Sequence, residues 1–191
     1  VAYKKLIQMI STKEDLVEYL KADSKQYQVQ TGKLLTRLRW NLFSNPASDT
    51  IYIWKYIKTL RFLEYYTNTN SRWGQMFYSY RLRKLGYKTG FQIPPNVCGP
   101  GITIYHYGPI IINDKTRIGR NVVLYPGVLI GHKVPGQPAP IIGNNVFIGS
   151  GAKIIGNVHI GDNVVIAPNA VVVKDVTSNT KVGGVPAYNL K

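Results

Sequence analysis

The second half of the sequence has a hydrophobic pattern with a period of six residues. Each repeat begins with an aliphatic residue and has a small or β-branched residue in its fifth place. The repeats are IGRNVV, LYPGVL, IGNNVF, IGSGAK, IIGNVH, IGDNVV and IAPNAV, which begin at Ile118, Leu124, Ile142, Ile148, Ile154, Ile160 and Ile166. This period fits neither an α-helix nor an alternating strand, and it is typical of a parallel β-helix in which short strands meet at tight corners. Gly and Asn between the aliphatic positions suit such corners because they tolerate positive φ angles.

The first half of the sequence has a helical pattern instead. Apolar and aromatic residues recur every three or four positions in 34–43, 51–66 and 73–87, which predicts helices there. We therefore predict a mostly β protein in which a helical, basic and aromatic-rich region, residues 1–90, precedes a β-helix, residues 91–191. We expect the helices to cap the open first coil and to pack against it or against a neighbouring subunit.

Positive charge is concentrated in the helical region. The chain has a formal net charge of +15, and residues 25–90 contain twelve Lys and Arg against only Asp49 and Glu64. A solvated face is the simplest interpretation, and contact with an anionic membrane that carries a lipid-linked saccharide is a second one. No nucleic-acid recognition motif accompanies the charge, so nucleic acid is not a predicted partner.

The single cysteine, Cys98, excludes a disulfide within the chain, which suits a reducing compartment. The sequence from Val1 has neither a signal-peptide pattern nor a run of about 20 apolar residues. We therefore expect a cytoplasmic protein, with the inner face of the membrane as the other location that the basic region allows.

The six-residue pattern resembles the left-handed β-helix of the hexapeptide-repeat acyltransferases. Three stretches are similar to serine acetyltransferase and to its relatives in surface-polysaccharide decoration: 99–113, PIIGNNVFIGSGAKIIGNVHIG, and GGVPA at 183–187. The resemblance covers about half of the chain. It implies an acetyl-CoA-dependent O-acetyltransferase without a metal, assembled as a homotrimer with active sites between subunits.

His106 is the candidate catalytic base, because the family's catalytic histidine matches this position. Counting back in sixes from Ile118 also reaches His106, where an aliphatic residue would normally fill the coil. The neighbouring Gly108 and Pro109 indicate that the register loosens there and that the ring turns toward a cleft. A neutral imidazole can take the proton of an acceptor hydroxyl as it attacks a thioester. Asp114 and Asn113 are the predicted groups that orient the ring, and a backbone carbonyl is the alternative.

The resemblance also implies where the acyl donor binds. In the family, the pantetheine arm lies in a groove between neighbouring C-terminal coils and contacts small residues. The matching positions and the lysines that could bind the donor's phosphate groups are Gly131, Ser150, Ala152, Pro168, Asn169, Lys153 and Lys174.

The acceptor is predicted from departures from the serine acetyltransferase pattern. The aspartate that assists the family's base matches Phe91, and the acidic residue before that base matches Tyr105. The Arg-His pair that holds the serine carboxylate matches Pro138 and Ala139. We therefore predict a sugar or polysaccharide-precursor hydroxyl as the acceptor, with serine as the alternative. Tyr105, Tyr107 and His132 are the candidate acceptor-binding residues.

Two other functions fit a β-helix. A zinc site of the γ-carbonic anhydrase type needs a close pair of histidines, whereas His106, His132 and His159 are separated by 26 and 27 residues, which disfavours it. A non-catalytic scaffold or binding module is the alternative from another class, and it would bind no CoA.

Overall fold

The computed structural model describes residues 7–25, 27 and 49–190. The helices are α1 (Lys13–Ser24), α3 (Thr50–Asn68) and α4 (Arg72–Thr89), so the helices predicted at 51–66 and 73–87 are confirmed. The helix predicted at 34–43 lies outside the described residues. No helix among the described residues is long and apolar enough to span a membrane.

The strands form three sheets that are the three faces of a β-helix. The first sheet contains β1 (Phe91–Gln92), β3 (Ile110–Ile112), β6 (Leu129–Gly131), β9 (Lys153–Ile155) and β12 (Val171–Val172). The second contains β4 (Arg117–Ile118), β7 (Ile141–Ile142) and β10 (His159–Ile160). The third contains β2 (Thr103–Ile104), β5 (Val123–Leu124), β8 (Phe147–Ile148), β11 (Val165–Ile166), β13 (Lys181–Gly183) and β14 (Tyr188–Asn189). The paired strands are parallel except β13 with β14, so successive coils stack in register.

The six-residue pattern accounts for the core. The aliphatic residue that begins each repeat is the inward residue of its strand; Ile118, Leu124 and Ile142 are each 0% exposed. The small residue in the fifth place is also buried, as at Val146 and Ala152, because it lies just inside a corner. Burial of these side chains removes apolar area from water along the whole column.

One corner of the β-helix is built by stacked asparagines. Asn121, Asn145, Asn163 and Asn179 have φ values between 55° and 60°, and each of the first three donates a side-chain hydrogen bond to the next, at 2.9–3.1 Å. Asparagine adopts this left-handed conformation more readily than most residues, and its amide carries both a donor and an acceptor. The corner explains why the repeat contains Asn at a fixed place.

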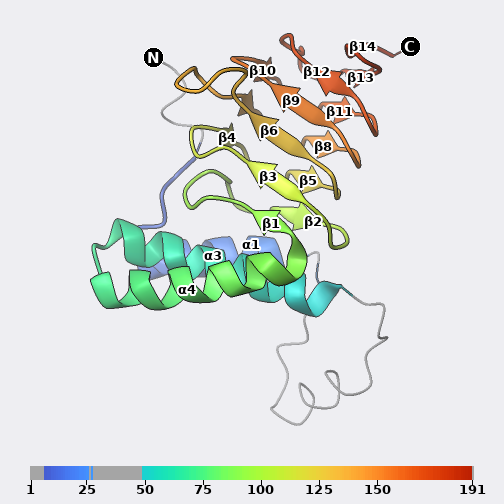
Figure 1. Cartoon of the computed structure of the whole chain (residues 1–191). Helices are drawn as coiled ribbons and strands as arrows, with labels where there is room; N and C mark the ends of the chain where they lie inside the picture. Colours follow the sequence, from blue (N-terminus) through green and yellow to red (C-terminus); the bar gives the residue numbers. More distant parts are fainter. Residues whose placement is uncertain (1–6, 26, 28–48, 191) are drawn as a thin grey trace.

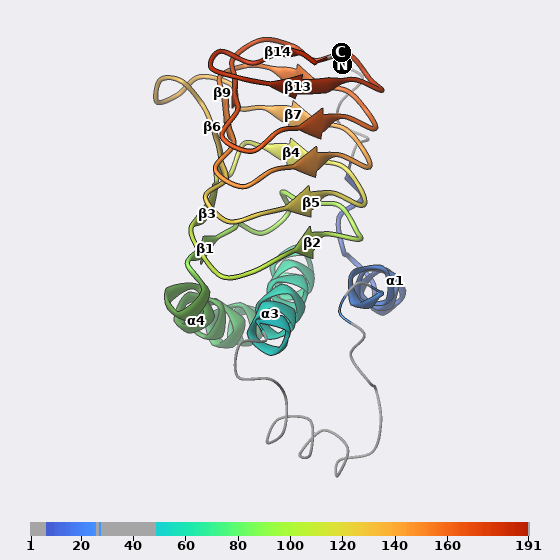
Figure 2. The same cartoon turned by 90° about the vertical axis from the view of Figure 1, so that its right-hand side faces the viewer.

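The helices pack across the open end of the first coil, and the C-terminal strands lie at the opposite end (Figures 1 and 2). α3 contributes Ile53, Tyr56, Ile57 and Leu60 to the same core as the β-helix. Tyr56 donates to the carbonyl of Phe91 at 3.4 Å and accepts from the amide of Ile93 at 3.1 Å. The predicted cap on the first coil is therefore present within this chain.

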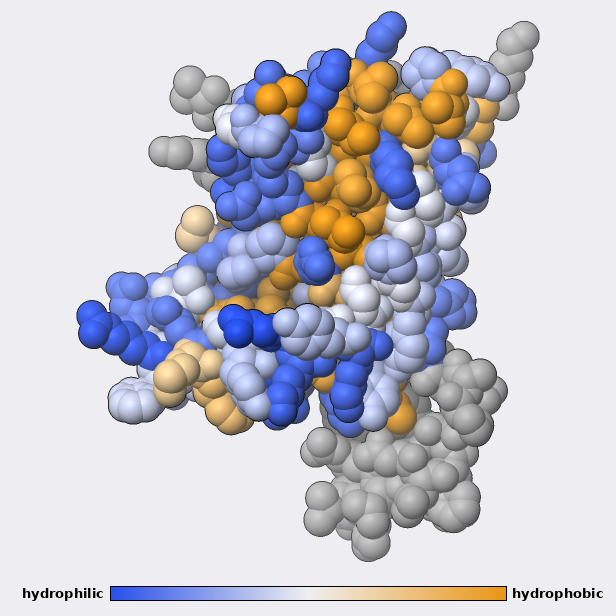
Figure 3. Space-filling model, viewed as in Figure 1, coloured by the Kyte–Doolittle hydropathy of each residue, from blue (hydrophilic) through white to orange (hydrophobic). Residues whose placement is uncertain are grey.

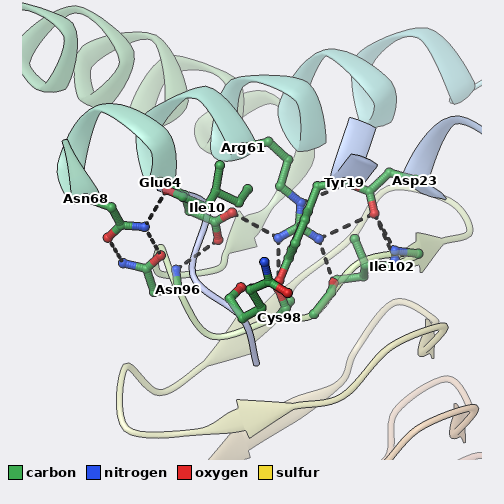
Figure 4. A network of polar contacts seen from close by, with 12 residues as sticks. Ile10, Tyr19, Asp23, Arg61, Glu64, Asn68, Asn96, Cys98 and Ile102 are labelled. Carbon is green, nitrogen blue, oxygen red and sulfur yellow. Dashed lines mark hydrogen bonds and ion pairs between the residues drawn. The ribbon is translucent and has the colours of Figure 1, made fainter. Parts of the chain in front are cut away.

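A buried ion network joins the helices to the first coil (Figure 4). Arg61 of α3 is 0% exposed, and its guanidinium contacts Asp23 of α1 at 2.8 Å and Glu64 at 3.0 Å. It also donates to the carbonyls of Cys98 and Gly99 at 2.8 and 2.7 Å. The interpretation of the basic residues as a solvated face is therefore wrong for Arg61, because two carboxylates and two carbonyls replace its water.

Candidate active site

His106 lies at the corner that follows β2, where the chain turns from the third sheet to the first. Its φ angle is 67°, in the left-handed region, and Gly108 two residues later has φ 138°. The preceding inward residue, Ile104, is buried, whereas the His106 side chain is 70% exposed. The expected loosening of the register is confirmed: the corner turns the imidazole out of the core.

Asp49, immediately before α3, is the side-chain partner of His106. Its Oδ2 lies 3.2 Å from His106 Nδ1 and accepts the backbone N–H of Tyr107 at 3.1 Å. The Asp49 side chain is 21% exposed, so the helix holds the carboxylate in a partly protected place. One oxygen therefore fixes both the ring and the backbone beside it.

This contact determines the proton arrangement of the ring. An ionised carboxylate can only accept hydrogen bonds, so Nδ1 carries the proton that points to Asp49. In the neutral ring, Nε2 then has the free lone pair, and it can accept a proton from a bound hydroxyl.

The orienting residues predicted from sequence are elsewhere. Asn113 accepts the amide of Lys115 at 2.9 Å, and the carbonyl of Asp114 accepts from Arg117 at 2.9 Å. Both residues follow β3 and lie at the corner between the first and second sheets. The prediction that they orient His106 is not supported within the chain, because a β-helix separates residues that follow successive strands onto different corners.

Aromatic rings surround the His106 corner. Tyr105 is 41% exposed and stacks on Tyr125 with 5.1 Å between ring centroids, and Tyr125 in turn contacts Phe147 at 5.4 Å. Tyr107 meets the edge of Tyr52 at 6.4 Å. Burial and the charge of Asp49 raise the pKa of the Tyr107 hydroxyl, which keeps it protonated and able to donate.

The same corner continues through the later coils, and we call this stack of corners (105–109, 125–128, 149–152 and 167–170) the His106 edge. The amide of Gly127 donates to the carbonyl of Pro109 at 2.7 Å. Gly151 donates to Pro126 and Asn169 donates to Ser150, both at 2.8 Å. The edge therefore contains four of the predicted donor-binding residues, which are Ser150, Ala152, Pro168 and Asn169.

The other predicted binding residues have different surroundings. The Lys153 ammonium donates to the carbonyls of Gly127 and Gly151, so corner carbonyls already occupy it. Gly131 ends β6, and His132 and Lys174 lie at corners between the first and second sheets, with Asn113 and Asp114. The buried Nδ1 of His132 has no hydrogen-bond partner among the described residues.

The cysteine lies away from this site, in the core. Among the described residues, no group of three His, Cys, Asp or Glu side chains could hold a metal ion. Cys98 is 1% exposed and packs in the main hydrophobic core as a small apolar residue. Burial raises the pKa of its thiol to about 12, so it supplies no thiolate.

Sequence reasoning missed Asp49 as a site residue. No spacing rule links it to His106, since 57 residues separate them. A compositional signal was present, because Asp49 and Glu64 are the only acidic residues in 25–90. Both of them bind specific partners in the structure.

Part of the β-helix is similar to a known repeat family. Residues 139–174 match the family model described as bacterial transferase hexapeptide (six repeats). The serine acetyltransferase of Synechococcus elongatus is 40% identical over 101 residues, which cover 51% of this chain and 41% of that protein. The serine acetyltransferase of Helicobacter pylori is 41% identical over 99 residues, covering 50% of this chain and 58% of that protein. The chain thus spans about half the length of the curated relatives that it matches.

Solved structures extend the likeness to the helices. The soybean serine acetyltransferase apoenzyme has a TM-score of 0.66 at 23% identity, and the match covers 93% of this chain and 69% of that chain. A serine acetyltransferase in complex with CoA has a TM-score of 0.64 at 23% identity, with 93% and 68% coverage. At this identity the likeness establishes the fold, and it confirms the predicted left-handed β-helix with a helical N-terminal region. The hexapeptide repeat at 139–174 and the similarity over about half of the chain therefore relate this protein to hexapeptide-repeat transferases, and among them to serine acetyltransferases.

Proposed function

We propose that the protein is an O-acetyltransferase that transfers the acetyl group of acetyl-CoA to a hydroxyl acceptor. The observation that carries the proposal is the contact between His106 and Asp49, at the end of an edge whose later corners are lined by small residues. The sequence relationship to serine acetyltransferases supports the same chemistry.

The proposed reaction uses direct attack. His106 Nε2 takes the proton of the acceptor hydroxyl while the hydroxyl oxygen attacks the thioester carbonyl carbon. The tetrahedral intermediate then collapses, the C–S bond breaks, and the CoA sulfur takes the proton from the His106 imidazolium and leaves as the thiol. Asp49 stabilises the imidazolium that forms between these steps. No protein nucleophile is needed, which agrees with the buried Cys98.

We further propose that the active unit is a homotrimer. The outer face of the first sheet is apolar: Ile111 is 40% exposed, Val173 beside β12 is 46% exposed, and Leu129, Ile155 and Val171 are partly exposed. Figure 3 shows this orange surface over β3, β6 and β9. Contact with other copies would remove it from water and would bring the His106 edge of one chain toward the segment between β6 and β7, residues 132–140, of its neighbour. Light scattering that finds a single active chain would contradict this assembly.

Serine is the acceptor that the comparisons favour. The relatives at 40–41% identity, matched over 99 to 106 residues, are named serine acetyltransferases. One solved structure of similar fold, from Neisseria gonorrhoeae, holds serine. Serine is thus the first acceptor to test.

A saccharide hydroxyl is the second candidate, and particular residues favour it. Ala139 is 4% exposed and Pro138 has no charge, so neither can hold a carboxylate as an Arg-His pair would. Loss of two charge-assisted hydrogen bonds of about 1.5–3 kcal/mol each would lower specificity for serine by roughly two to four orders of magnitude. A sugar needs no carboxylate clamp and packs against aromatic rings such as the exposed Tyr105.

A thiol-release assay with acetyl-CoA tests both levels of the proposal. We expect thiol release that requires an added hydroxyl acceptor, from a panel of serine, nucleotide sugars and oligosaccharides. A specificity constant for serine of about 10⁴ M⁻¹s⁻¹ or more, within the ordinary enzyme range, assigns serine. A value at least about a hundredfold lower, with faster release for a saccharide, assigns the second candidate. A protein that binds no CoA and releases no thiol with any acceptor would be a scaffold instead.

A further inference from the structure

The outer face of α4 carries a continuous stripe of exposed apolar and aromatic side chains. Trp73, Met76, Phe77, Tyr80 and Tyr87 are 80%, 60%, 55%, 58% and 83% exposed. Their spacing of one, three or four residues and then seven places them within one arc of a helix with 3.6 residues per turn. A surface that stays in contact with water rarely exposes several large apolar side chains side by side.

The opposite side of α4 is the one that packs on the protein. Tyr78 stacks on Phe62 and Tyr66 of α3, with centroid distances of 5.1 and 5.3 Å. Leu82 and Leu85 are partly buried against the main core. The exposed stripe is therefore not the side by which α4 packs on the protein, because the opposite side makes those contacts.

Basic residues border the stripe on both sides. At about 100° per residue, Arg72 and Arg83 fall along one margin and Arg81 and Lys88 along the other, while Lys84 lies within the stripe. The Lys84 ammonium is 4.7 Å from the centre of the Tyr80 ring. The sequence of α4 contains no Asp or Glu. Figure 3 shows blue and tan side chains side by side over the region of α4.

We propose that this face of α4 binds the surface of a membrane that contains anionic lipid. An apolar stripe between basic margins is the pattern of a helix that lies in the interface plane, where lipid tails receive the apolar side chains and headgroup phosphates receive the lysines and arginines. Trp and Tyr suit the same depth because each has an apolar ring with a polar group. The helix packs across the end of the β-helix opposite to β14, so the coils leave its outer face uncovered (Figures 1 and 2).

The charge of α4 disfavours a second copy of the chain as the binding partner of this face. Two α4 faces in contact would bring five basic residues against another five with no acidic residue on either helix. Like charges at that range repel, whereas an anionic headgroup layer neutralises both margins at once. The proposal does not depend on the acetyl-transfer reaction.

Sedimentation of the full chain with lipid vesicles tests the proposal. We expect the protein to sediment with vesicles of phosphatidylcholine and phosphatidylglycerol (7:3), to bind pure phosphatidylcholine at least about tenfold more weakly, and to be released by about 1 M salt. Reversing the charges of a margin residue and of the lysine within the stripe, Arg83→Glu with Lys84→Glu, should lower binding by at least about tenfold. The matched control is Lys115→Glu with Arg120→Glu, which changes the net charge equally at exposed corners of the β-helix and should have little effect.

A second variant removes the apolar contribution without changing charge. Trp73→Ser with Phe77→Ser should also lower vesicle binding by at least about tenfold, and circular dichroism should show an unchanged fold because both side chains are exposed. Equal losses in the two charge-reversed pairs would overturn the proposal, as would full binding by the Trp73→Ser/Phe77→Ser variant. Absence of vesicle binding would overturn it too. In that case, binding of a single-stranded oligonucleotide or self-association of the chain would identify a different partner for α4.

Discussion

Replacement of His106 by alanine should lower the rate of acetyl transfer by about 10²–10⁴-fold, the usual contribution of a positioned general base. The acceptor hydroxyl would then lose its proton only to water, while the residues proposed to bind the donor along the His106 edge would be unchanged. Because the His106 side chain is 70% exposed and fills no part of the core, the free energy of unfolding should change little. Steady-state turnover and CoA affinity, measured on the same preparation, separate these effects.

The matched control is His159→Ala. His159 is in β10 of the second sheet, where its Nδ1 lies 3.7 Å from Asp175, and its side chain is 37% exposed. The substitution removes the same imidazole from a different face of the β-helix, so we expect turnover within about twofold of the original protein. Full turnover in a well-folded His106→Ala protein would remove His106 from the mechanism.

Asp49→Asn provides a companion test of the positioning group. The amide oxygen of asparagine can still accept the Nδ1 proton, but the negative charge that stabilises the imidazolium is lost. A hydrogen bond to a charged group contributes about 1.5–3 kcal/mol, and the exposure of His106 favours the lower value, so kcat should fall about tenfold. KM for acetyl-CoA should not change, and Asp49→Glu should restore part of kcat. An altered KM with an unaltered kcat would indicate a binding role instead.

The sequence predicted the β-helix well because its repeat reports burial directly. The aliphatic residue that begins each repeat points into the core. The asparagines of the repeat, such as Asn121, Asn145 and Asn163, lie at corners with positive φ angles, so the local sequence and the overall fold agree. The exposed corner position of His106 followed from the same reasoning, since Gly108 and Pro109 interrupt the register.

The partners of His106 and Arg61 could not be predicted in the same way. Asn113 and Asp114 are near His106 in sequence, but eight residues along a coil lead to another corner. The true partner comes from the start of a helix, and helical periodicity says nothing about which coil that helix covers. Arg61 was counted with the surface charges because its burial depends on Asp23, a residue of a different helix.

Replacement of Arg61 by methionine should lower the free energy of unfolding by about 3–5 kcal/mol, the cost of breaking a buried ion pair. Methionine keeps the apolar stem but removes every donor of the guanidinium. Asp23 and Glu64 are then left charged in the interior, and the carbonyls of Cys98 and Gly99 lose their donor. Urea unfolding at fixed protein concentration, followed by circular dichroism, measures the loss.

Lys58→Met is the matched control, since Lys58 is exposed on the same helix and its loss should change stability by less than about 0.5 kcal/mol. The hydrogen-exchange response should also be local. Asp23 accepts the amides of Gly101 and Ile102, and Glu64 accepts the amide of Asn96, so these amides should exchange faster in Arg61→Met. Uniformly faster exchange in every coil would indicate general unfolding and would contradict a local role.

The destabilisation by Arg61→Met should depend on pH in a defined direction. Burial raises the pKa of Glu64 above its ordinary value of 4.5, and the positive charge of Arg61 opposes that rise. Without Arg61 the pKa in the folded protein rises further, so the folded state binds a proton more readily than the unfolded state. A group of this kind contributes stability below its unfolded pKa and loses it as pH rises through the folded value. The difference between Arg61→Met and the original protein should therefore be smaller near pH 5 than at pH 8, and the opposite order would show that the carboxylates are not the origin of the loss.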